Sequence, residues 1–281
     1  MKNEENMKQK LLEKLDDFVT SEYENEKGVK TIKSYKQEVN YFLDWLPDVS
    51  EKNLKSTLID FKEHLQEKYK PATCNHYIVV VNKFLFFCGY EERLKKLKIQ
   101  HTSSLNNQLE EIDHKRMLRW AKNMGLDDMY LIMKLFAKSG IRVIEIKYFT
   151  VEELNWSMEI YNKGKYREII IPNDLVRELR KYCRENKIRS GYIFKAPKDP
   201  SKPLSASTIW ERLKRIAKRA KINPNKIHPH AWRHLFAKNA KEAGIDLDEL
   251  SDLLGHNNLN TTAIYTKTSS KEKRKKLERM R

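Results

Sequence analysis

Six side chains in the second half of the sequence could together hold and cleave a phosphodiester. Two are arginines, one is a lysine, two are histidines and one is a tyrosine, in the order Arg142, Lys163, His230, Arg233, His256 and Tyr265. The set contains no carboxylate and no thiol. Phosphoryl transfer depends mainly on positioning and on the stabilisation of charge, and fixed cations provide both. These residue types therefore predict a site that holds a phosphodiester while the tyrosine oxygen attacks it.

The local sequence indicates how the arginines and one histidine are placed. Gly140 is expected to end a helix, so that Arg142 lies at the start of the next one, where backbone N–H groups also favour an anion. Glu145, three residues later, is expected to orient nearby basic side chains. His230 and Arg233 are three residues apart and are therefore neighbours on one helix face. Arg233 can bind two phosphate oxygens in a fork, and His230 can exchange a proton with a nucleophile.

The spacing of His256 and Tyr265 requires a turn in the chain. Nine helical residues make about two and a half revolutions, which would place the two side chains on opposite faces of a straight helix. Gly255 supplies a helix stop, and Asn260 with Thr261 supplies a cap for a new short helix that carries Tyr265. The two side chains are therefore expected to meet across this turn.

Together these residues and their contexts resemble the tyrosine recombinase (phage integrase) family. The segments that carry the resemblance are 139–146, 162–167, 228–234 and 253–265, and the resemblance is specific over residues 136–266. They contain the family's arginine box, lysine turn, His-x-x-Arg box, and Leu-Gly-His followed by a tyrosine nine residues later. Asn162 replaces the first glycine of a common Gly-Lys-Gly turn, and Ala231 with Trp232 replaces a frequent Asp-Leu pair.

The resemblance implies a role for each residue of the site. Tyr265 would form a 3′-phosphotyrosine, and Lys163 would protonate the leaving 5′ oxygen, with Lys165 as a second candidate for that role. Strand-like runs within residues 160–172 flank a glycine-containing turn and predict a β-hairpin that carries both lysines. The phosphate would be held by Arg142, His230, Arg233 and His256. No metal ion, ATP or other cofactor is implied.

A metal site is the main rival for the histidines at 228, 230 and 234. Only His230 and His234 would share a helix face, no glutamate lies between them, and Arg233 would crowd a cation. The acidic residues nearby are expected in the first turns of a helix, where carboxylates interact well with the helix dipole. These are Asp246, Asp248, Glu249 and Asp252. We therefore expect no metal site.

The composition favours a polyanion-binding protein. Residues 1–100 hold 18 Lys and Arg against 17 Asp and Glu, and residues 101–281 hold 38 against 22, so +16 of the net charge of +17 lies in the part with the cationic set. A generally lysine-rich composition is the alternative. The three cysteines show no zinc spacing, which predicts a reduced cytoplasmic protein, nucleoid-associated when on DNA. The charged start predicts that there is no signal peptide, and the most apolar stretch is too short to span a bilayer.

The predicted fold is mainly α with a small β-sheet (α+β) in two domains. Residues 1–100 are expected to form a four-helix core-binding bundle, with an apolar helix face that includes Val29, Ile32, Val39 and Phe42. The basic run 93–98 is read as a solvated helix end or as a hinge near DNA. A polar linker is expected at 101–111, and a catalytic domain at 112–281 with a basic tail from about 268. By the resemblance, the two domains form a C-shaped clamp around DNA.

Several polar side chains outside the cationic set are candidate DNA contacts, although simple exposure explains them equally well. Some lie near a helix start, some share a helix whose other face is buried, and two lie near the predicted site. They are Lys30, Thr31, Lys33, Thr73, Asn75, His76, Lys83, Lys165 and His234.

The function implied is site-specific recombination of integrase or transposase type, by a Xer-like or transposon-encoded enzyme of minimal two-domain size. The implied partners are duplex DNA with a specific site, three further copies in a homo-tetramer held by the C-terminal tail, and an accessory directionality factor. A tail that simply binds DNA is the rival reading. A type IB topoisomerase-like relaxase, a non-catalytic DNA-binding relative and a metal-dependent hydrolase are the alternative functions.

Overall fold

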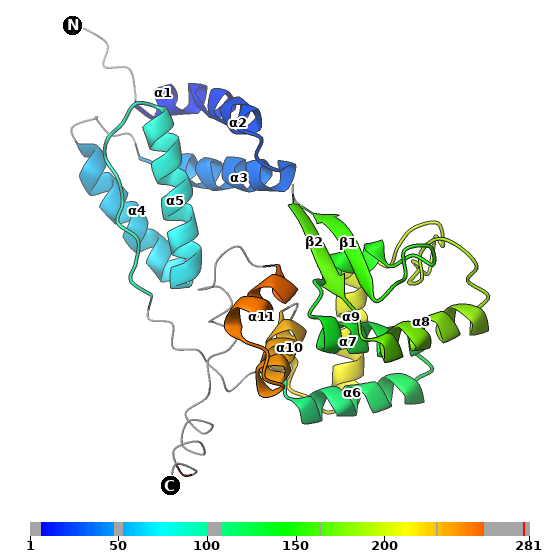
Figure 1. Cartoon of the computed structure of the whole chain (residues 1–281). Coiled ribbons are helices and arrows are strands. Elements are labelled where there is room, and N and C mark those ends of the chain that lie inside the picture. Colours follow the sequence, from blue (N-terminus) through cyan, green and yellow to red (C-terminus); the bar gives the residue numbers. More distant parts are fainter. Residues whose placement is uncertain are drawn as a thin grey trace, which may run out of the picture. The chain divides into compact units, whose positions relative to one another are not determined.

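The computed structural model describes residues 7–47, 53–99, 108–162, 165–228, 230–255 and 278, and of Asn162 and Lys165 it describes the backbone alone (Figure 1). The chain divides into two compact units, Met1–Thr102 and Ser103–Arg281, which we call the N-terminal and C-terminal units. The division falls inside the segment predicted to be a linker. Each unit has a hydrophobic core of its own.

The N-terminal unit is a bundle of α-helices. Its described part contains α1 (Met7–Glu13), α2 (Leu15–Glu24), α3 (Val29–Trp45), α4 (Leu54–Lys68) and α5 (Pro71–Phe87). Five helices stand where four were predicted, because the first is interrupted at Lys14, which becomes the N-cap of α2. Ile32, Val39 and Phe42 of α3 are buried as predicted, whereas Val29 is 73% exposed. Pro71 lies in the first turn of α5, where its missing N–H costs nothing.

The basic run after α5 is not a helix end. Residues 89–99, which we call the strap, are irregular chain, and two asparagines seven residues apart on α5 hold them. The Asn82 amide donates to the Leu94 carbonyl at 2.9 Å and accepts from the Leu94 N–H at 2.8 Å. Asn75 makes the same pair of bonds to Leu97, at 3.0 and 2.7 Å. The strap is thus paired with a helix through side-chain amides in place of a neighbouring strand.

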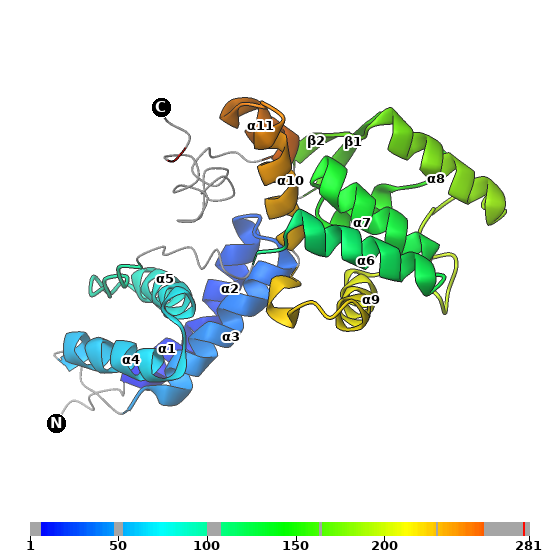
Figure 2. The same ribbon diagram turned by 90° about the horizontal axis from the view of Figure 1, so that it is seen from below.

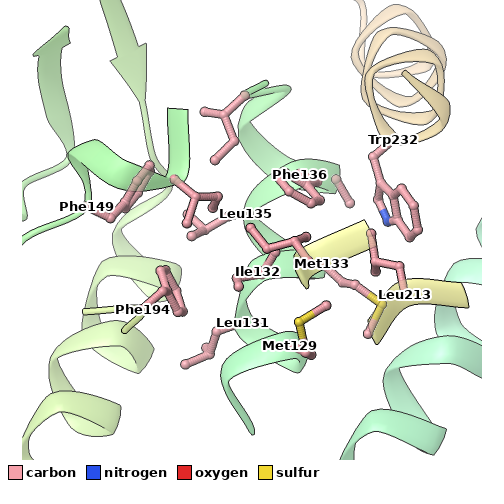
Figure 3. Close-up of a cluster of buried hydrophobic side chains, with 14 of the residues drawn as sticks. Met129, Leu131, Ile132, Met133, Leu135, Phe136, Phe149, Phe194, Leu213 and Trp232 are labelled. Carbon is pink, nitrogen blue, oxygen red and sulfur yellow. The ribbon is translucent and has the colours of Figure 1, made fainter. Parts of the chain in front are cut away.

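The C-terminal unit packs its helices around α7. In chain order its described elements are α6 (Glu111–Asn123), α7 (Asp127–Ser139), the 3-10 helix η3 (Val143–Tyr148), β1 (Ser157–Asn162), β2 (Lys165–Ile170), α8 (Asn173–Glu185), α9 (Ala206–Arg219), the 3-10 helix η4 (Pro224–Lys226), α10 (Ala231–Glu242) and α11 (Leu247–Leu254). Figure 2 shows α6 and α10 beside α7. Side chains of α7 lie between Phe149 and Phe194 on one side and Leu213 and Trp232 on the other (Figure 3). A helix that is apolar around most of its circumference belongs in a core.

The β-hairpin is confirmed, and its register determines which side chains face inward. β1 and β2 are antiparallel, with Ile160 opposite Arg167, Tyr161 opposite Tyr166 and Asn162 opposite Lys165. Ile160 is buried, whereas the Tyr161 and Tyr166 rings are exposed and lie 5.0 Å apart. Because neighbouring strand residues point to opposite faces, Arg167 lies on the face away from the tyrosines.

The predicted fold class is confirmed, since the chain is mainly helical with one two-stranded sheet in its described part. None of the helices described is long and apolar enough to cross a membrane.

Candidate active site

Gly140 and the residues after it determine where Arg142 lies. Gly140 ends α7 with φ +59°, and a Cβ there would lie 2.5 Å from Cδ1 of Phe236, so both the backbone and the packing require glycine. Arg142 then becomes the N-cap of η3. The prediction that Arg142 starts the helix after Gly140 is confirmed, although that helix is 3-10 and not α.

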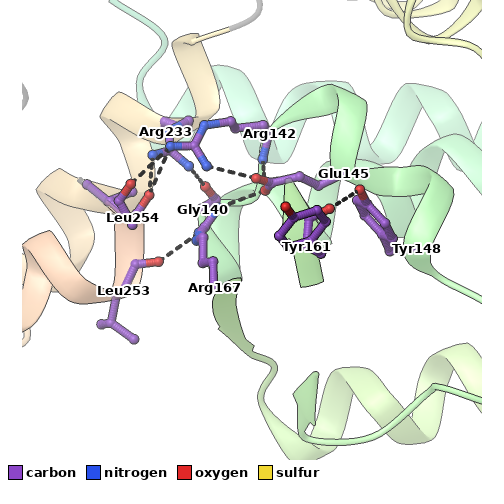
Figure 4. Close-up of polar contacts among 10 residues, drawn as sticks. Gly140, Arg142, Glu145, Tyr148, Tyr161, Arg167, Arg233, Leu253 and Leu254 are labelled. Carbon is purple, nitrogen blue, oxygen red and sulfur yellow. Dashed lines mark hydrogen bonds and ion pairs between the residues drawn. The ribbon is translucent and has the colours of Figure 1, made fainter. Parts of the chain in front are cut away.

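Glu145 is the acidic centre of the site (Figure 4). Its side chain is fully buried, with one oxygen accepting from Nη1 of Arg142 at 2.8 Å and the other from the Arg142 backbone N–H and Nη1 of Arg167, each at 2.7 Å. Burial alone would raise the pKa of Glu145, but the two arginines outweigh it and hold the pKa below its usual value. Glu145 therefore orients two basic side chains, as expected from its position in the sequence.

The C-terminal end of α11 supplies a row of carbonyls to three arginines. Nη2 of Arg167 donates to the Leu253 carbonyl at 2.7 Å, and Nη2 of Arg233 donates to the Leu254 carbonyl at 2.7 Å. Nη2 of Arg142 lies 3.4 Å from the Leu254 carbonyl and 3.2 Å from that of Gly255. The last carbonyls of a helix lack partners within it and carry partial negative charge. The end of α11 therefore gathers the arginines in one place.

The two arginines of the predicted catalytic set differ in access. The side chain of Arg142 is 30% exposed. Arg233 is 1% exposed, and its Nη1 donates to the Gly140 carbonyl. Of this pair, Arg142 is thus accessible to solvent, whereas Arg233 is buried and connects α10 to the ends of α7 and α11.

The histidines near α10 favour their neutral forms. Partial burial, with Arg233, His228 and Arg142 nearby, lowers the pKa of His230, which lies at the N-cap of α10. Burial lowers the pKa of His228 and, with the neighbouring histidines and Arg233, lowers the pKa of His234 to about 4. A neutral imidazole at pH 7 can accept a proton. Within the part of the chain that the structure describes, no three His, Cys, Asp or Glu side chains are arranged to hold a metal ion.

Trp232 explains one departure from the family's usual sequence. Its side chain is 2% exposed in the core, and its indole N–H donates to Nδ1 of His114 at 3.2 Å. A buried indole N–H needs an acceptor, and His114 on α6 supplies one. Sequence reasoning missed His114, since 118 residues separate the two partners.

Three predicted catalytic residues, Lys163, His256 and Tyr265, lie outside the described residues, and Lys165 begins β2. Arg142, His230 and Arg233 are placed as stated above, and the half-buried His234 lies on α10. Arg167 is a member of the network that the sequence did not suggest.

The predicted DNA contacts of the N-terminal unit fall into two groups. Lys30, Thr31 and Lys33 in the first turns of α3 and Thr73 on α5 are exposed. The other three are engaged within the unit: Asn75 holds the strap, Nε2 of His76 lies 2.9 Å from Glu38, and Lys83 bonds the buried Glu22. All seven stay predictions.

Comparison with known proteins identifies the family. The sequence matches the phage integrase family over residues 107–272. A tyrosine recombinase XerA of Pyrococcus furiosus is 30% identical over 285 residues, covering 97% of this chain and 96% of the relative. A tyrosine recombinase XerD of Listeria innocua is 28% identical, covering 86% of this chain and 89% of the relative. The chain belongs to the phage integrase family.

A solved structure shares the fold. The XerH site-specific recombinase, bound to a palindromic difH substrate in a post-cleavage complex, matches with a TM-score of 0.75 at 18% identity, covering 90% of this chain and 80% of that one. Together with the family match, these relatives identify the chain as a tyrosine-type site-specific DNA recombinase, an enzyme that breaks and rejoins DNA strands.

Proposed function

We propose that Tyr265 attacks the scissile phosphate of a DNA strand and that the cationic set identified in the sequence holds that phosphate. A bond forms between the tyrosine oxygen and phosphorus, and the bond between phosphorus and the 5′ oxygen breaks. Lys163, or Lys165 two residues later, gives a proton to the departing 5′ oxygen. The 3′-phosphotyrosine conserves the energy of the broken bond, so the 5′-hydroxyl of a partner strand can reverse the step without ATP.

The arginine network is the observation that carries this proposal. Arg142 and Arg233 reach the same Leu254 carbonyl, and Arg142 and Arg167 share Glu145. Three guanidinium groups against one carboxylate leave an excess of positive charge, which the α11 carbonyls offset in part. A phosphodiester is the anion that such a site suits, because preorganised positive charge stabilises the charge that develops in phosphoryl transfer.

The neutral histidines complete the chemistry. A free tyrosine has a pKa of about 10, so attack near pH 7 needs a proton acceptor. We propose that His230, whose pKa is lowered and which lies three residues before Arg233, takes this proton while His256 donates a hydrogen bond to the phosphate. Loss of the phenol proton and gain of a proton by the 5′ oxygen then balance in the cleavage step.

The remaining proposals follow from the resemblance and from the relatives. We propose that residues 1–100 form a DNA-binding domain, 101–111 a linker and 112–281 the catalytic domain, which together clamp duplex DNA that carries a recombination site. The tail from about 268 would link four copies into a tetramer, and an accessory factor would set direction. The protein would act in the cytoplasm on nucleoid DNA.

A covalent-trapping experiment tests this function. Nicked suicide duplexes drawn from the DNA that flanks the gene are incubated with the protein in EDTA, and adducts that resist SDS are collected. The expected adduct links the protein to a 3′ phosphate, and it is absent with Tyr265→Phe and retained with Tyr23→Phe, a matched change at a tyrosine that is 69% exposed in the N-terminal unit. An adduct that persists with Tyr265→Phe would reject this nucleophile. Loss of the adduct in EDTA would reject metal-independent cleavage.

A further inference from the structure

Arg167 holds the lysine-bearing hairpin to two other parts of the site. Its side chain is 8% exposed and bonds Glu145, 22 residues away, and the Leu253 carbonyl, 86 residues away, each at 2.7 Å. One side chain therefore joins β2 to η3 and to the end of α11. Its role in the cleavage chemistry proposed above is so far unassigned.

The fit around Arg167 is tight as well as polar. Gly255 has φ +60°, and a Cβ there would lie 2.5 Å from Cδ and 2.8 Å from Nε of Arg167. The end of α11 therefore lies directly against the arginine stem, at a backbone position that favours glycine. Burial lowers the pKa of Arg167, and Glu145 opposes this effect. The guanidinium is thus fixed by a carboxylate, a carbonyl and a close backbone.

Arg167 lies close to Lys165 along the strand. It lies two residues after Lys165 in β2, which at about 3.4 Å per residue places the two Cα atoms about 7 Å apart. Residues 163 and 164 join β1 to β2 just beyond. The Tyr148 hydroxyl at the end of η3 donates to the backbone carbonyl of Tyr161 in β1 at 2.5 Å. Polar contacts to both strands therefore hold the described part of the hairpin to η3.

We propose that Arg167 is a positioning residue that places the hairpin lysine at the leaving 5′ oxygen. This inference rests on the proposed function, since the lysine is the proton donor there. Glu145 forms ion pairs with both Arg142 and Arg167, so one buried carboxylate fixes the position of the proposed phosphate-binding arginine relative to the hairpin. Without Arg167 the hairpin loses its bonds to Glu145 and to the Leu253 carbonyl and keeps the bond from Tyr148, so the strand that leads to the lysine is held less firmly and the lysine leaves its position. A displacement of about 1 Å can cost about a hundredfold in rate.

A change of leaving group separates this role from a merely structural one. An alkoxide leaves poorly without a proton, whereas a thiolate leaves readily because thiols have a pKa of about 8.5. A duplex with sulfur in place of the bridging 5′ oxygen therefore needs no proton donor at the leaving group. If Arg167 acts through the lysine, replacing it should slow cleavage of the oxygen duplex and spare the sulfur duplex. Replacing Arg142, which is proposed to bind the phosphate, should slow both.

The experiment measures single-turnover adduct formation on the two duplexes. For Arg167→Met we expect a loss of about a hundredfold on oxygen and recovery to within about fivefold of the unsubstituted protein on sulfur. Arg167→Lys, which keeps the charge but cannot reach both acceptors in a fork, should lose about tenfold on oxygen and recover likewise. Arg212→Met is the matched control, since Arg212 forms a half-buried pair with Asp128 between α9 and α7 and should cleave both duplexes normally.

Each outcome decides the proposal. Equal losses on the two duplexes, or no loss on either, would overturn the positioning role of Arg167. If Arg167→Met fails to fold by circular dichroism, the same comparison with Arg167→Lys decides. Failure of the unsubstituted protein to form an adduct on both duplexes would instead reject the proposed function, so the two failures are distinguishable.

Discussion

Acid should destabilise the C-terminal unit through its buried histidine, His114. The ring is 5% exposed and accepts the Trp232 indole N–H on Nδ1. Burial lowers the pKa of His114 to about 4, from 6.5 in an unstructured chain, with Lys115 and Lys134 adding to the effect and Glu111 opposing it. Because the folded pKa lies below the unfolded one, the unfolded state takes up the proton first. Stability is therefore full above about pH 6.5 and falls as the pH decreases towards 4.

The size of the effect follows from the two pKa values. At about pH 5 most unfolded chains carry the proton on this histidine and few folded ones do, which corresponds to a loss of about 2 kcal/mol. Below about pH 4 the loss approaches about 3 kcal/mol. Glu145, Glu152, Asp174 and Asp199 have lowered pKa values, so their contributions are lost only at more acidic pH. Between about pH 6.5 and 5, buried histidines dominate.

Urea unfolding followed by tryptophan fluorescence tests this reasoning in the unsubstituted protein and in His114→Asn. Asparagine can place an amide oxygen near the position of Nδ1, keep the indole bond and remove the titration. We expect the difference in unfolding free energy between the two proteins to change by about 2 kcal/mol from about pH 7.5 to about pH 5. His234 is present in both proteins and cancels. Parallel pH profiles, or an NMR titration that gives His114 a pKa near 6.5, would refute the argument.

Three further substitutions test contacts within each of the two units. Glu145→Gln should lower stability by about 3 to 5 kcal/mol in urea, because it leaves the buried guanidinium group of Arg167 uncompensated. Glu178→Gln, at a carboxylate that is 39% exposed, should cost about 1 kcal/mol or less, and similar losses would contradict the central role of Glu145. Gly255→Ala should lower the melting temperature more than Gly191→Ala, since both glycines have positive φ but only the methyl group at 255 would meet the Arg167 side chain. Equal decreases in melting temperature would mean that the Arg167 side chain moves aside easily. Asn82→Leu should speed hydrogen exchange at the Leu94 amide and lower the free energy of unfolding by about 1 to 3 kcal/mol. Asn186→Leu, at an exposed helix end, should lower it by about 0.5 kcal/mol or less. Unchanged exchange at the Leu94 amide would show that Asn82 does not hold the strap.

Local patterns predicted the elements well where each element is determined by nearby residues. The pattern of apolar residues predicts helices over residues 175–186 and 247–254, and the structure has them at Asn173–Glu185 and Leu247–Leu254. Pro172 precedes the first, and Asp246 caps the second by accepting from the Glu249 N–H at 2.8 Å. Such caps act within one turn, so the sequence alone reveals them.

Features that depend on distant partners were not predictable in this way. The basic run 93–98 was interpreted as a solvated helix end or as a hinge near DNA, because nothing within it shows that Asn75 and Asn82 bind the backbone of Leu97 and Leu94. The orienting role of Glu145 was expected from its spacing to Arg142, but the contribution of Arg167 depends on a carbonyl 86 residues away. The indole of Trp232 likewise finds its acceptor on another helix. In each case a one-dimensional pattern identifies a polar side chain and leaves its partner open.

The register of the β-hairpin limits where this gene can gain or lose codons. Insertions between Asn162 and Lys165 would leave the pairing of Ile160 with Arg167 intact, but they would move the lysine that is proposed to protonate the leaving oxygen. One codon gained or lost between Arg167 and Ile169 would exchange the two faces of the strand and turn either the arginine outward or a buried isoleucine into solvent. Length variation among active natural homologues should therefore be rare throughout the hairpin, and libraries built to retarget the enzyme should keep both the tip and the strand below it fixed in length.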